Sequence, residues 1–324
     1  MDLLSRAIDE LGLRRASFRR FVVGAGPWAL EYEAGVQGVH IVTSGACELV
    51  VGKSRTLLGP EDLVLLPQGS AHALRGVGGS VRGPARSARQ LLLAQPAPGP
   101  VRVGAGAPSC ELVCGTLDFE AKDHPMLASI GAVLVIQRSH LRDARKLSGW
   151  IEALVDEVDH GRPGHDAVVT RLAELLFIEA LRTRAAGSSD CPSGGWFRGI
   201  RDESLGRALS AFHADIAARW SVASLAKVAV QSRAAFARRF TAVLGESPLA
   251  YARRWRLFHA RRLLRTTGDS LDEVANRVGY GSAAALSLAF TRAVGVSPGA
   301  YRAGQVARAA PGGSVDDRGH GTGC

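Results

Sequence analysis

The chain has 324 residues, of which 40 are Lys or Arg and 30 are Asp or Glu, and its formal net charge is +10. This length predicts two domains, each able to bury its own core. No run of about 18 apolar residues occurs and no basic-then-apolar segment opens the sequence, so we expect neither a membrane span nor a secretory signal. The five cysteines lack the spacing of a disulfide framework, which favours a cytoplasmic protein with reduced thiols.

The positive charge is concentrated in one half of the chain. Residues 1–185 carry 21 Lys and Arg against 20 Asp and Glu, whereas residues 201–305 carry 16 against 7. A GC-rich genome raises the arginine content, but it does not confine the excess to one half. A basic half joined to a neutral half predicts a phosphate-binding module attached to a sensing or assembly module.

The neutral half begins with a segment, residues 1–20, whose pattern predicts an amphipathic helix. Four apolar runs bounded by Gly or Pro then predict short strands, namely Trp28–Tyr32, Val39–Val42, Cys47–Val51 and Asp62–Leu66. Such even spacing is typical of a sandwich or barrel. Residues 76–109 are rich in Gly, Pro and Ala and predict a long loop, with a short strand or helix at Gln90–Ala94. Cys110–Leu117 predicts another buried strand.

From Leu147 the apolar period becomes helical. Trp150, Leu154 and Val158 share one face, residues 161–164 interrupt the pattern, and a second helix follows with an apolar stripe. This helical pair predicts either a dimer interface or a cover for its own barrel. The composition then predicts a sensor or dimerisation domain over 1–184, a linker over 185–198, a basic domain over 199–304 and a disordered tail over 305–324.

A pattern in the basic domain occurs twice, 50 residues apart, with Phe-Thr, Gly, Ser-Pro and Tyr over 240–251 and again over 290–301. Upstream of each copy lie a short apolar helix, a turn and a serine. Ser232 in the first copy and Ser282 in the second are expected to start the next helix. Short helix, tight turn and serine-started helix form the layout of a helix-turn-helix. Two in tandem predict a protein that reads adjacent stretches of one DNA duplex.

The first recognition helix is expected to turn Phe236 and Phe240 inward. Its outward positions are Arg233, Ala234, Ala237 and Arg238. An outward arginine can bind a guanine through two hydrogen bonds, worth about 1–3 kcal/mol of discrimination. Other arginines can reach phosphates, namely Arg239, Arg253, Arg254, Arg256, Arg261, Arg262 and Arg265. For each of these alone, a solvated helix face is the alternative interpretation.

The second recognition helix has a nearly apolar outward face. Its outward positions are Ala283, Ala284, Ala285 and Leu288, with Ser287 and Arg292 as the polar groups. Alanine and leucine can touch a thymine methyl but carry little hydrogen-bond information. The second motif is therefore expected to hold DNA weakly, or to read DNA by shape and phosphate.

These segments resemble the DNA-binding domain of AraC/XylS-type transcriptional regulators. The resemblance covers Ile200 to Arg302 and rests on Ser232–Phe240, Val278–Ser282 and Gly295–Arg302. It implies promoter DNA and RNA polymerase as partners, and base contacts at Ala234, Ala237, Arg238, Ala283, Ala284 and Leu288. The family usually has Arg or Lys where Leu288 stands. The full set of candidate DNA-binding residues is Ser232, Arg233, Ala234, Ala237, Arg238, Arg239, Ser282, Ala283, Ala284, Ser287, Leu288 and Arg292.

The neutral half contains segments similar to cupin motifs. Asp62–His72 resembles the second cupin motif, and Gly38–Gly45 resembles a reduced form of the first. Cupin enzymes hold a metal with two or three histidines and usually a glutamate. Here His40 and His72 are the candidate metal ligands that remain. Local hydrogen bonding of these histidines is the alternative, and we expect neither a metal nor another cofactor.

Three cysteines on predicted strands are candidates for redox chemistry. Cys110 and Cys114 would lie about 13 Å apart along one strand, which is too far for a direct disulfide. Cys47 belongs to another strand and could approach one of them. Buried, inert thiols are the alternative, since a redox pair needs a group that stabilises a thiolate.

The sequence thus predicts an α+β multidomain chain, with an N-terminal cupin-like β-barrel plus a helical pair and a C-terminal all-α double helix-turn-helix. We expect a sequence-specific transcription regulator, not an enzyme. Its cupin-like domain would sense a small molecule or an oxidant and would support a homodimer. Two alternatives stay open: a metal-dependent cupin enzyme fused to a DNA-binding module, and a DNA-binding protein whose cupin only dimerises.

Overall fold

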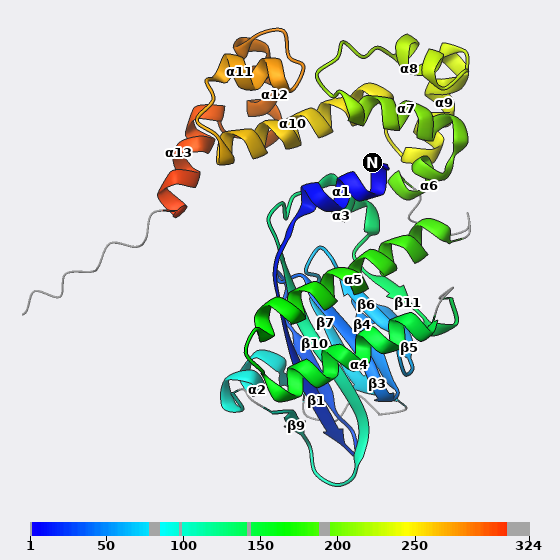
Figure 1. The fold of residues 1–324 in the computed structure, drawn as a ribbon, viewed down its shortest axis with the longest axis vertical. Helices are drawn as coiled ribbons and strands as arrows, with labels where there is room; N and C mark the ends of the chain where they lie inside the picture. The colour runs from blue at the N-terminus through cyan, green and yellow to red at the C-terminus, as the bar shows by residue number, and fades with distance from the viewer. Residues whose placement is uncertain (1, 78–84, 97–98, 141–143, 188–194, 310–324) are drawn as a thin grey trace, which may run out of the picture.

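The computed structural model describes residues 2–77, 85–96, 99–140, 144–187 and 195–309. The part up to residue 187 is built around β-sheets, and the part from residue 195 is all helical and lies across one end of the first (Figure 1). This arrangement confirms the predicted fold class. None of the described helices is long and apolar enough to cross a lipid bilayer.

The N-terminal strands form two sheets. The first has the order β11-β6-β3-β10-β1-β9, and the second has the order β5-β4-β7-β2-β8. The strands are β1 (Leu13–Gly24), β2 (Ala29–Tyr32), β3 (Gly38–Gly45), β4 (Cys47–Val51), β5 (Ser54–Leu58), β6 (Leu63–Leu66), β7 (His72–Gly76), β8 (Ala85–Ser87), β9 (Val101–Val103), β10 (Pro108–Phe119) and β11 (Leu134–Ile136). Within the described residues the strands do not close into one barrel, so the expected barrel is corrected to a pair of packed sheets.

Gly45 carries the chain from one sheet to the other. It ends β3 in the first sheet, and β4 of the second sheet begins two residues later. Its φ is +73°, and a Cβ at this position would lie 2.2 Å from the carbonyl oxygen of Ser109. Only glycine fits so close to the neighbouring backbone. The turn places Cys47 beside the start of β10.

Apolar residues cover both faces of the first sheet. One face packs on the second sheet around Leu30, Leu74 and Leu112. The other face packs under two long helices, α4 (Ala144–His160) and α5 (His165–Ala186), as Figure 1 shows. A sheet buried on both faces explains why all four residues of β6 are buried. The helical pair therefore covers its own domain, the second of the two predicted alternatives.

The expected helix over residues 1–20 is wrong beyond Leu11. Helix α1 spans Leu3–Leu11 and ends at Gly12, and the chain then enters β1. In β1, Ala16 and Phe18 are buried on alternate positions, which is the period of a strand. Pairing with β10 along its length determines this conformation.

The remaining N-terminal helices are short. They are α2 (Ala88–Ala94), α3 (Pro125–Ile130) and the single 3-10 turn η1 (Arg138–His140). Helix α2 supplies the short element expected at Gln90–Ala94. The predicted linker over 185–198 is partly helical, because α5 continues to Ala186 and α6 begins at Trp196. Residues 188–194 lie outside the described residues.

The C-terminal part consists of two similar helical units joined by one long helix, α10. Its helices are α6 (Trp196–Arg201), α7 (Glu203–Ala214), α8 (Val222–Val228), α9 (Arg233–Leu244), α10 (Pro248–Thr266), α11 (Leu271–Arg277), α12 (Ala283–Val294) and α13 (Pro298–Ala309). Helix α13 continues past residue 305, where the disordered tail was expected to begin, and residues 310–324 lie outside the described part.

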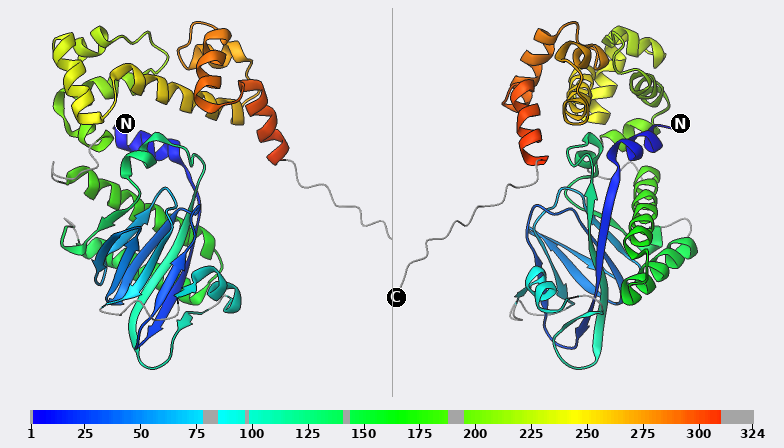
Figure 2. Two further views of the ribbon diagram at one scale, coloured as in Figure 1. Left: turned by 180° about the vertical axis from the view of Figure 1, so that it is seen from behind. Right: turned by 60° about the vertical axis from the view of Figure 1, so that its left-hand side comes forward.

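The first helical unit shares its core with the N-terminal domain. One apolar cluster runs from the sheet face under α5 through Trp196 to Phe236 and Trp255, whereas the second unit has a separate core around Leu286 and Phe290. Figure 2 shows from two further directions that α1 and α3 lie between the sheets and α10. The N-terminal domain therefore contacts the helix that joins the two units.

Candidate nucleic-acid interface and sensor core

Serine caps set the start of each helix in the two helix-turn-helix units. Ser221 and Ser270 are the N-cap residues of α8 and α11. Each serine side chain accepts a hydrogen bond from the backbone N–H of the third helical residue, and the side chain of that residue accepts one from the serine backbone N–H. Ser232 and Ser282 begin the recognition helices α9 and α12, where each hydroxyl accepts from the third backbone N–H. The predicted boundaries of these helices are thus confirmed to within one or two residues.

Helix α9 turns an apolar face inward and a basic face outward. Phe236 and Phe240 are buried, and Phe240 packs edge-on against Tyr251 with ring centroids 5.6 Å apart. Arg233 and Arg238 are exposed on the opposite side, and neither forms an ion pair with any described residue. An exposed, unpaired guanidinium keeps all its donors for a partner outside the chain.

The outward face of helix α12 is nearly apolar, as its sequence predicted. Leu286 and Phe290 are fully buried, while Leu288 is 65% exposed. Ala284 is exposed beside it, Ala283 and Ser287 are half-buried, and Arg292 is exposed in the last turn. The outward face of α12 therefore offers methyl groups where α9 offers two guanidinium groups.

Several arginines expected at phosphates have partners within the protein. Arg239 donates to Asp202 through Nε at 2.9 Å and Nη2 at 2.6 Å. Burial raises the pKa of Asp202, but hydrogen bonds from Leu205 and Arg239 outweigh burial and leave this pKa lowered. On α10, Arg254 pairs with Glu246 at 2.5 Å. Any phosphate contact by these groups would compete with an existing ion pair.

Arg256 of the connecting helix α10 holds the loop between α7 and α8 in the first helical unit. Its Nε and Nη2 donate to the carbonyl oxygens of Ile216 and Ala218, at 2.8 Å and 2.6 Å. The loop that carries these carbonyls also meets the turn of the second unit, where a Cβ on Gly279 would lie 2.7 Å from the carbonyl oxygen of Ala217. By contrast, Arg253 is exposed and unpaired among the described residues, and remains a candidate for phosphate.

The turn of the first unit contains a strained valine that sequence reasoning missed. Val230 has φ +56° and is 78% exposed, and Gly279 has φ +78° at the matching place in the second unit. Gln231 and Tyr280, which follow them, donate to the carbonyls of Ala226 and Ala275 in the same way. A β-branched residue is strongly disfavoured in the left-handed region. Aligning the two turns by these hydrogen bonds would have revealed the mismatch.

Replacing Val230 by glycine is expected to raise the free energy of unfolding by about 0.5–1 kcal/mol, since relief of strain exceeds the entropic cost of glycine. Little packing is lost because the side chain is exposed. Urea unfolding measures the change. The matched variant Gly279→Val is expected to destabilise by at least about 2 kcal/mol, because its side chain would clash with Ala217. Lower stability of Val230→Gly would contradict the strain.

A charged cluster joins the N-terminal domain to α7 and α10, and no local sequence signal reveals it. Arg6 donates to the carbonyl of His213 at the end of α7. Glu10 lies 3.6 Å from His124 and 3.7 Å from His259, measured from its Oε2 to each Nε2. Asp123 pairs with Arg261 at 2.9 Å and Arg265 at 3.5 Å. Two more of the expected phosphate-binding arginines are therefore engaged by the N-terminal domain.

Burial controls the titration of the histidines in this cluster. Burial lowers the pKa of His124 and His259, although Glu10 partly opposes the shift in both. The pKa of His213 is well below its usual range because of burial and of the nearby His259 and Arg6. Burial raises the pKa of Glu10, but its interactions with His124 and His259 outweigh burial and leave this pKa lowered. At neutral pH the cluster contains a carboxylate among neutral imidazoles.

In the sensor domain, His40 and His72 come together from the two sheets. Their Nε2 atoms are 2.7 Å apart, and Nδ1 of His72 lies 2.8 Å from the carbonyl oxygen of Ser70. Because that oxygen only accepts, Nδ1 of His72 carries the proton and its Nε2 accepts from His40. Burial lowers the pKa of both rings. A metal ion held by both would have to replace their mutual hydrogen bond.

Donor groups for a metal are few around these histidines. The ring of Tyr32 stacks on His72 with centroids 4.6 Å apart and occupies one side of the pair. Among the described residues, no group of three or more His, Cys, Asp or Glu side chains lies close enough to hold a metal ion. The observed contacts match the alternative of locally hydrogen-bonded histidines.

The three candidate cysteines are free and buried between the sheets. Cys47 and Cys110 are neighbours, and their mutual hydrogen bond raises the pKa of Cys47 and lowers that of Cys110. Cys114 lies by Tyr32, and burial raises its pKa to about 12. Cys47 and Cys110 therefore interact with each other, whereas Cys114 interacts with Tyr32.

Two serine-capped recognition helices on one connecting helix, attached to a two-sheet domain, define a DNA-binding transcription regulator. A cupin family model matches residues 2–186 and a helix-turn-helix family model matches residues 225–304. The chain is 30% identical over 307 residues to an AraC-like transcription regulator of Streptomyces lividans, covering 93% of this chain and 98% of that protein. It is 29% identical over 322 residues to the HTH-type transcriptional regulator AlkR of Acinetobacter baylyi, with 93% and 99% covered.

Among solved structures, the DNA-binding domain of AdpA in complex with a target DNA is 38% identical, covers 34% of this chain and 100% of that chain, and gives a TM-score of 0.33. The chain belongs to the AraC-like transcription regulators with an N-terminal cupin domain. This confirms the resemblance seen in the sequence. The two family models leave residues 187–224 between them, so the domain boundaries stay a prediction.

Proposed function

We propose that this regulator binds a promoter mainly through α9, with Arg238 as the base-reading side chain and α12 as a weaker, shape-reading partner. The observation that carries the proposal is the contrast between the two outward faces. Arg238 is exposed and unpaired, whereas Leu288 fills the corresponding position on α12 and is 65% exposed. An arginine fork discriminates bases and a leucine does not. Ser232, Arg233, Ala234, Ala237 and the matching residues of α12 line the two contact faces.

The cupin domain, on this proposal, controls how the two DNA-binding units are held. Its helix α1 and the turn before α3 contact α7 and α10 through Arg6, Glu10 and Asp123. An effector, either a small molecule or an oxidant, would change these contacts and thereby change DNA affinity by a coupling free energy of about 1–3 kcal/mol. The protein would act without catalysis in the cytoplasm, as a homodimer that contacts RNA polymerase.

An oxidant would act on Cys47 and Cys110. Two thiols and one peroxide molecule give one disulfide and two water molecules, so a disulfide can form without any other reactant. The lowered pKa of Cys110 supports its role as the attacking thiolate. Both side chains are buried, at 0% and 2% exposed, so the reaction requires the sheets to open locally.

The test is the affinity of the full chain for its own upstream DNA, measured by fluorescence anisotropy at fixed salt, fully reduced and after mild peroxide treatment. We expect tight, sequence-dependent binding that shifts on oxidation, and loss of the shift in Cys47→Ser and Cys110→Ser. Cys114→Ser is the matched control and should retain it. Failure to bind upstream DNA better than a scrambled duplex would overturn the proposed function. Tight binding without a shift would exclude an oxidant as the effector and would leave a small molecule as the effector.

Replacing Leu288 by arginine is expected to strengthen DNA binding, because it adds a groove-facing cation to the nearly apolar outward face of α12. One added phosphate or base contact should raise affinity about tenfold at low salt, and less as salt increases. Leu288→Gln, which adds hydrogen-bonding capacity without charge, is the matched variant. Equal affinities of Leu288→Arg and the parent at low salt would show that α12 does not lie in a groove.

A further inference from the structure

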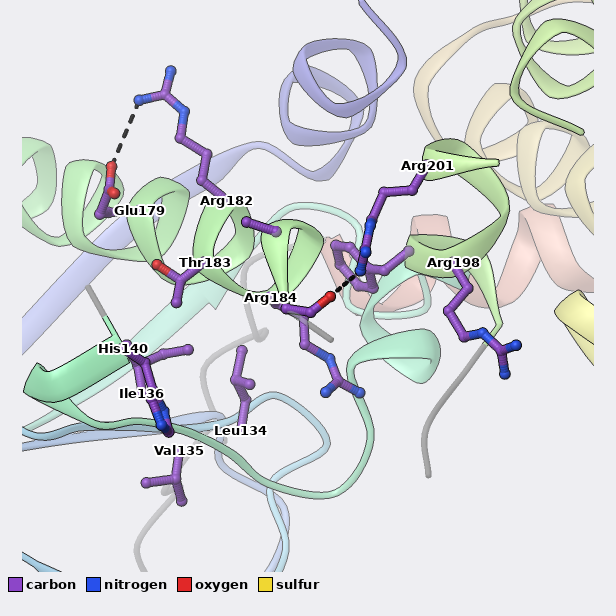
Figure 3. Close-up of a pocket in the computed structure, with 13 residues that line it drawn as sticks. Leu134, Val135, Ile136, His140, Glu179, Arg182, Thr183, Arg184, Arg198 and Arg201 are labelled. Atoms are coloured by element: carbon purple, nitrogen blue, oxygen red, sulfur yellow. Dashed lines mark hydrogen bonds and ion pairs between the residues drawn. The ribbon is translucent and has the colours of Figure 1, made fainter. Parts of the chain in front are cut away.

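The two helical units are attached to the rest of the chain in different ways. The first unit shares its apolar core with the N-terminal domain, and Arg201 of α6 donates to the carbonyl of Gly187 at the end of α5 (Figure 3). The second unit has its own core around Leu286 and Phe290, and α10 contributes residues to both cores. The two units lie at opposite ends of α10 (Figure 1). The position of α12 relative to α9 therefore depends on α10 and on any further contact between the units.

The loop that joins α7 to α8, residues 215–221, is held in one conformation by its own hydrogen bonds. The Oδ1 atom of Asp215 accepts from the backbone N–H groups of Ala217 and Ala218, at 3.0 Å and 3.1 Å. The indole N–H of Trp220 donates to the carbonyl oxygen of Asp215 at 2.7 Å, and its backbone N–H donates to that of Ala218 at 2.7 Å. A loop bonded to itself in this way is a rigid piece of structure and not a flexible linker.

This loop lies between α10 and the turn of the second unit. On one side, Nε and Nη2 of Arg256 donate to the carbonyl oxygens of Ile216 and Ala218. On the other side, the backbone of Gly279 approaches that of Ala217 so closely that a Cβ on the glycine would lie 2.7 Å from the carbonyl oxygen. The loop therefore contacts α10 and the second unit at the same time.

The environment of Arg256 indicates that its guanidinium is not meant for phosphate. The side chain is half-buried, its bonds go to carbonyl oxygens, and it forms no ion pair with a residue that the structure describes. Burial lowers its pKa, and Tyr280 of the second unit and Asp215 of the loop partly oppose that shift. Withdrawing a cation from water without a counter-ion costs free energy. That cost is understandable if the bonds of Arg256 to the loop have a function.

We propose that the loop 215–221, held by Arg256 against Gly279, sets the separation of α9 and α12 and thereby selects the spacing of the two operator segments. Successive major-groove segments on one face of a duplex lie about 34–36 Å apart, or roughly 10–10.5 base pairs. One inserted base pair moves the second segment by about 3.4 Å and turns it by about 35°. Two helices in a fixed arrangement fit one spacing. Two helices joined by α10 alone would fit several, each with a larger loss of conformational freedom on binding.

Arg256 is on this proposal a positioning residue, because it acts on DNA through the loop and the second unit. Selection of operator spacing rests on the proposed function, since both recognition helices must contact DNA. The fixed separation of α9 and α12 does not rest on it, because that separation is a property of the chain without DNA. The two parts are therefore measured separately.

The spacing test measures the affinity of the full chain for its upstream DNA by fluorescence anisotropy at fixed salt. Matched duplexes have one base pair inserted or deleted between the two segments that the parent protects in a footprint. We expect the parent to lose at least about fivefold in affinity on either change, and Arg256→Gln at most about twofold. Asp215→Ala, which removes the acceptor inside the loop, should show the same tolerance. Asp215→Asn retains an acceptor oxygen and is the matched control, with the spacing preference of the parent.

The distance test uses the full chain without DNA. Spin labels are attached at Ala242→Cys in α9 and Ala293→Cys in α12, both exposed positions, with Cys191 and Cys324 replaced by serine. The three cysteines between the sheets are buried and do not take the label. Double electron–electron resonance should give one narrow distance distribution in the parent and in the asparagine control. The distribution should be at least about twice as wide in the glutamine and alanine variants.

An unchanged distance distribution in Arg256→Gln would show that α10 alone sets the separation and would overturn the inference. Equal loss of affinity at every spacing, with a slope of log K against log salt that is smaller by about 0.9, would instead show that Arg256 contacts a phosphate, and would also overturn it. Thermal unfolding curves establish that the variants are folded. Asp215→Ala changes an exposed residue and decides the question if Arg256→Gln does not fold.

Failure of this inference differs from failure of the proposed function. A parent that prefers its upstream DNA to a scrambled duplex but accepts every spacing would overturn the inference and leave the proposed function standing. A parent without any preference for its upstream DNA would overturn the proposed function and, with it, the selection of spacing. The distance distributions would then still decide whether Arg256 and the loop fix the separation of α9 and α12.

Discussion

Replacing Arg238 by alanine is expected to relax base preference at one position of the operator by about 1–3 kcal/mol, a factor of roughly 5 to 150. The side chain is exposed on the outward face of α9 and has no ion-pair partner among the described residues. It can therefore present both donors of its fork to the O6 and N7 atoms of a guanine. Competition between the operator and its single-base variants at fixed salt measures the change in preference.

Arg253→Ala provides the matched comparison, because Arg253 is also exposed and unpaired but lies on the connecting helix α10. Loss of a phosphate contact should weaken binding to all sequences alike and reduce the slope of log K against log salt by about 0.9. If Arg238→Ala keeps the sequence preference of the parent and loses affinity uniformly, Arg238 contacts the backbone and the placement of α9 in the groove is wrong.

Acidification from pH 7.5 to 5.5 is expected to lower the free energy of unfolding markedly. Burial lowers the pKa values of His124, His213 and His259 in the folded chain, so the unfolded chain binds protons first as the pH falls below about 6.5. For each histidine that stays neutral in the folded chain, the free energy of unfolding falls by up to about 1.4 kcal/mol for every pH unit below 6.5. Their stabilising contribution is complete above that pH and is lost as the pH falls toward the folded pKa values.

Glu10 adds to the same trend but at lower pH. Its pKa is lowered in the folded state, so its contribution is present above the unfolded value near 4.5 and is lost as the pH falls through the folded one. The interval from pH 7.5 to 5.5 therefore reports histidines rather than this carboxylate. Urea unfolding at several pH values, followed by far-UV circular dichroism, measures the slope.

His259→Gln should reduce this slope by up to about one proton, because it removes one of the histidines whose pKa is lowered by burial. A parent slope that is flat or of the opposite sign would show that the buried histidines are already protonated in the folded chain. Because α10 joins both DNA-binding units, we also expect DNA affinity to become more salt-sensitive in the same pH interval as the cluster opens.

Local signals made the helix-turn-helix units predictable. Ser232 and Ser282 cap their helices through bonds that span three residues, and Phe236 and Phe240 face inward because of helical periodicity. The nearly apolar outward face of α12 follows from the same periodicity. Strand β1 was not predicted, because its conformation depends on pairing with β10, whose partner residues lie 84 to 106 positions away in the chain. Val230 was missed for a related reason, since its left-handed backbone is imposed by the turn and not by its own preference.

The sequence by itself determined which residues cap, bury and face outward within each helix, and through the repeated motif it determined the family and its DNA partner. These properties depend on neighbours a few positions away. Only the tertiary structure decided which arginines remain available, because Asp202, Asp123 and the carbonyl of Ile216 reach Arg239, Arg261 and Arg256 from distant segments. It also decided that Cys47 pairs with Cys110, since a turn between two sheets brings together thiols that lie 63 residues apart in the chain.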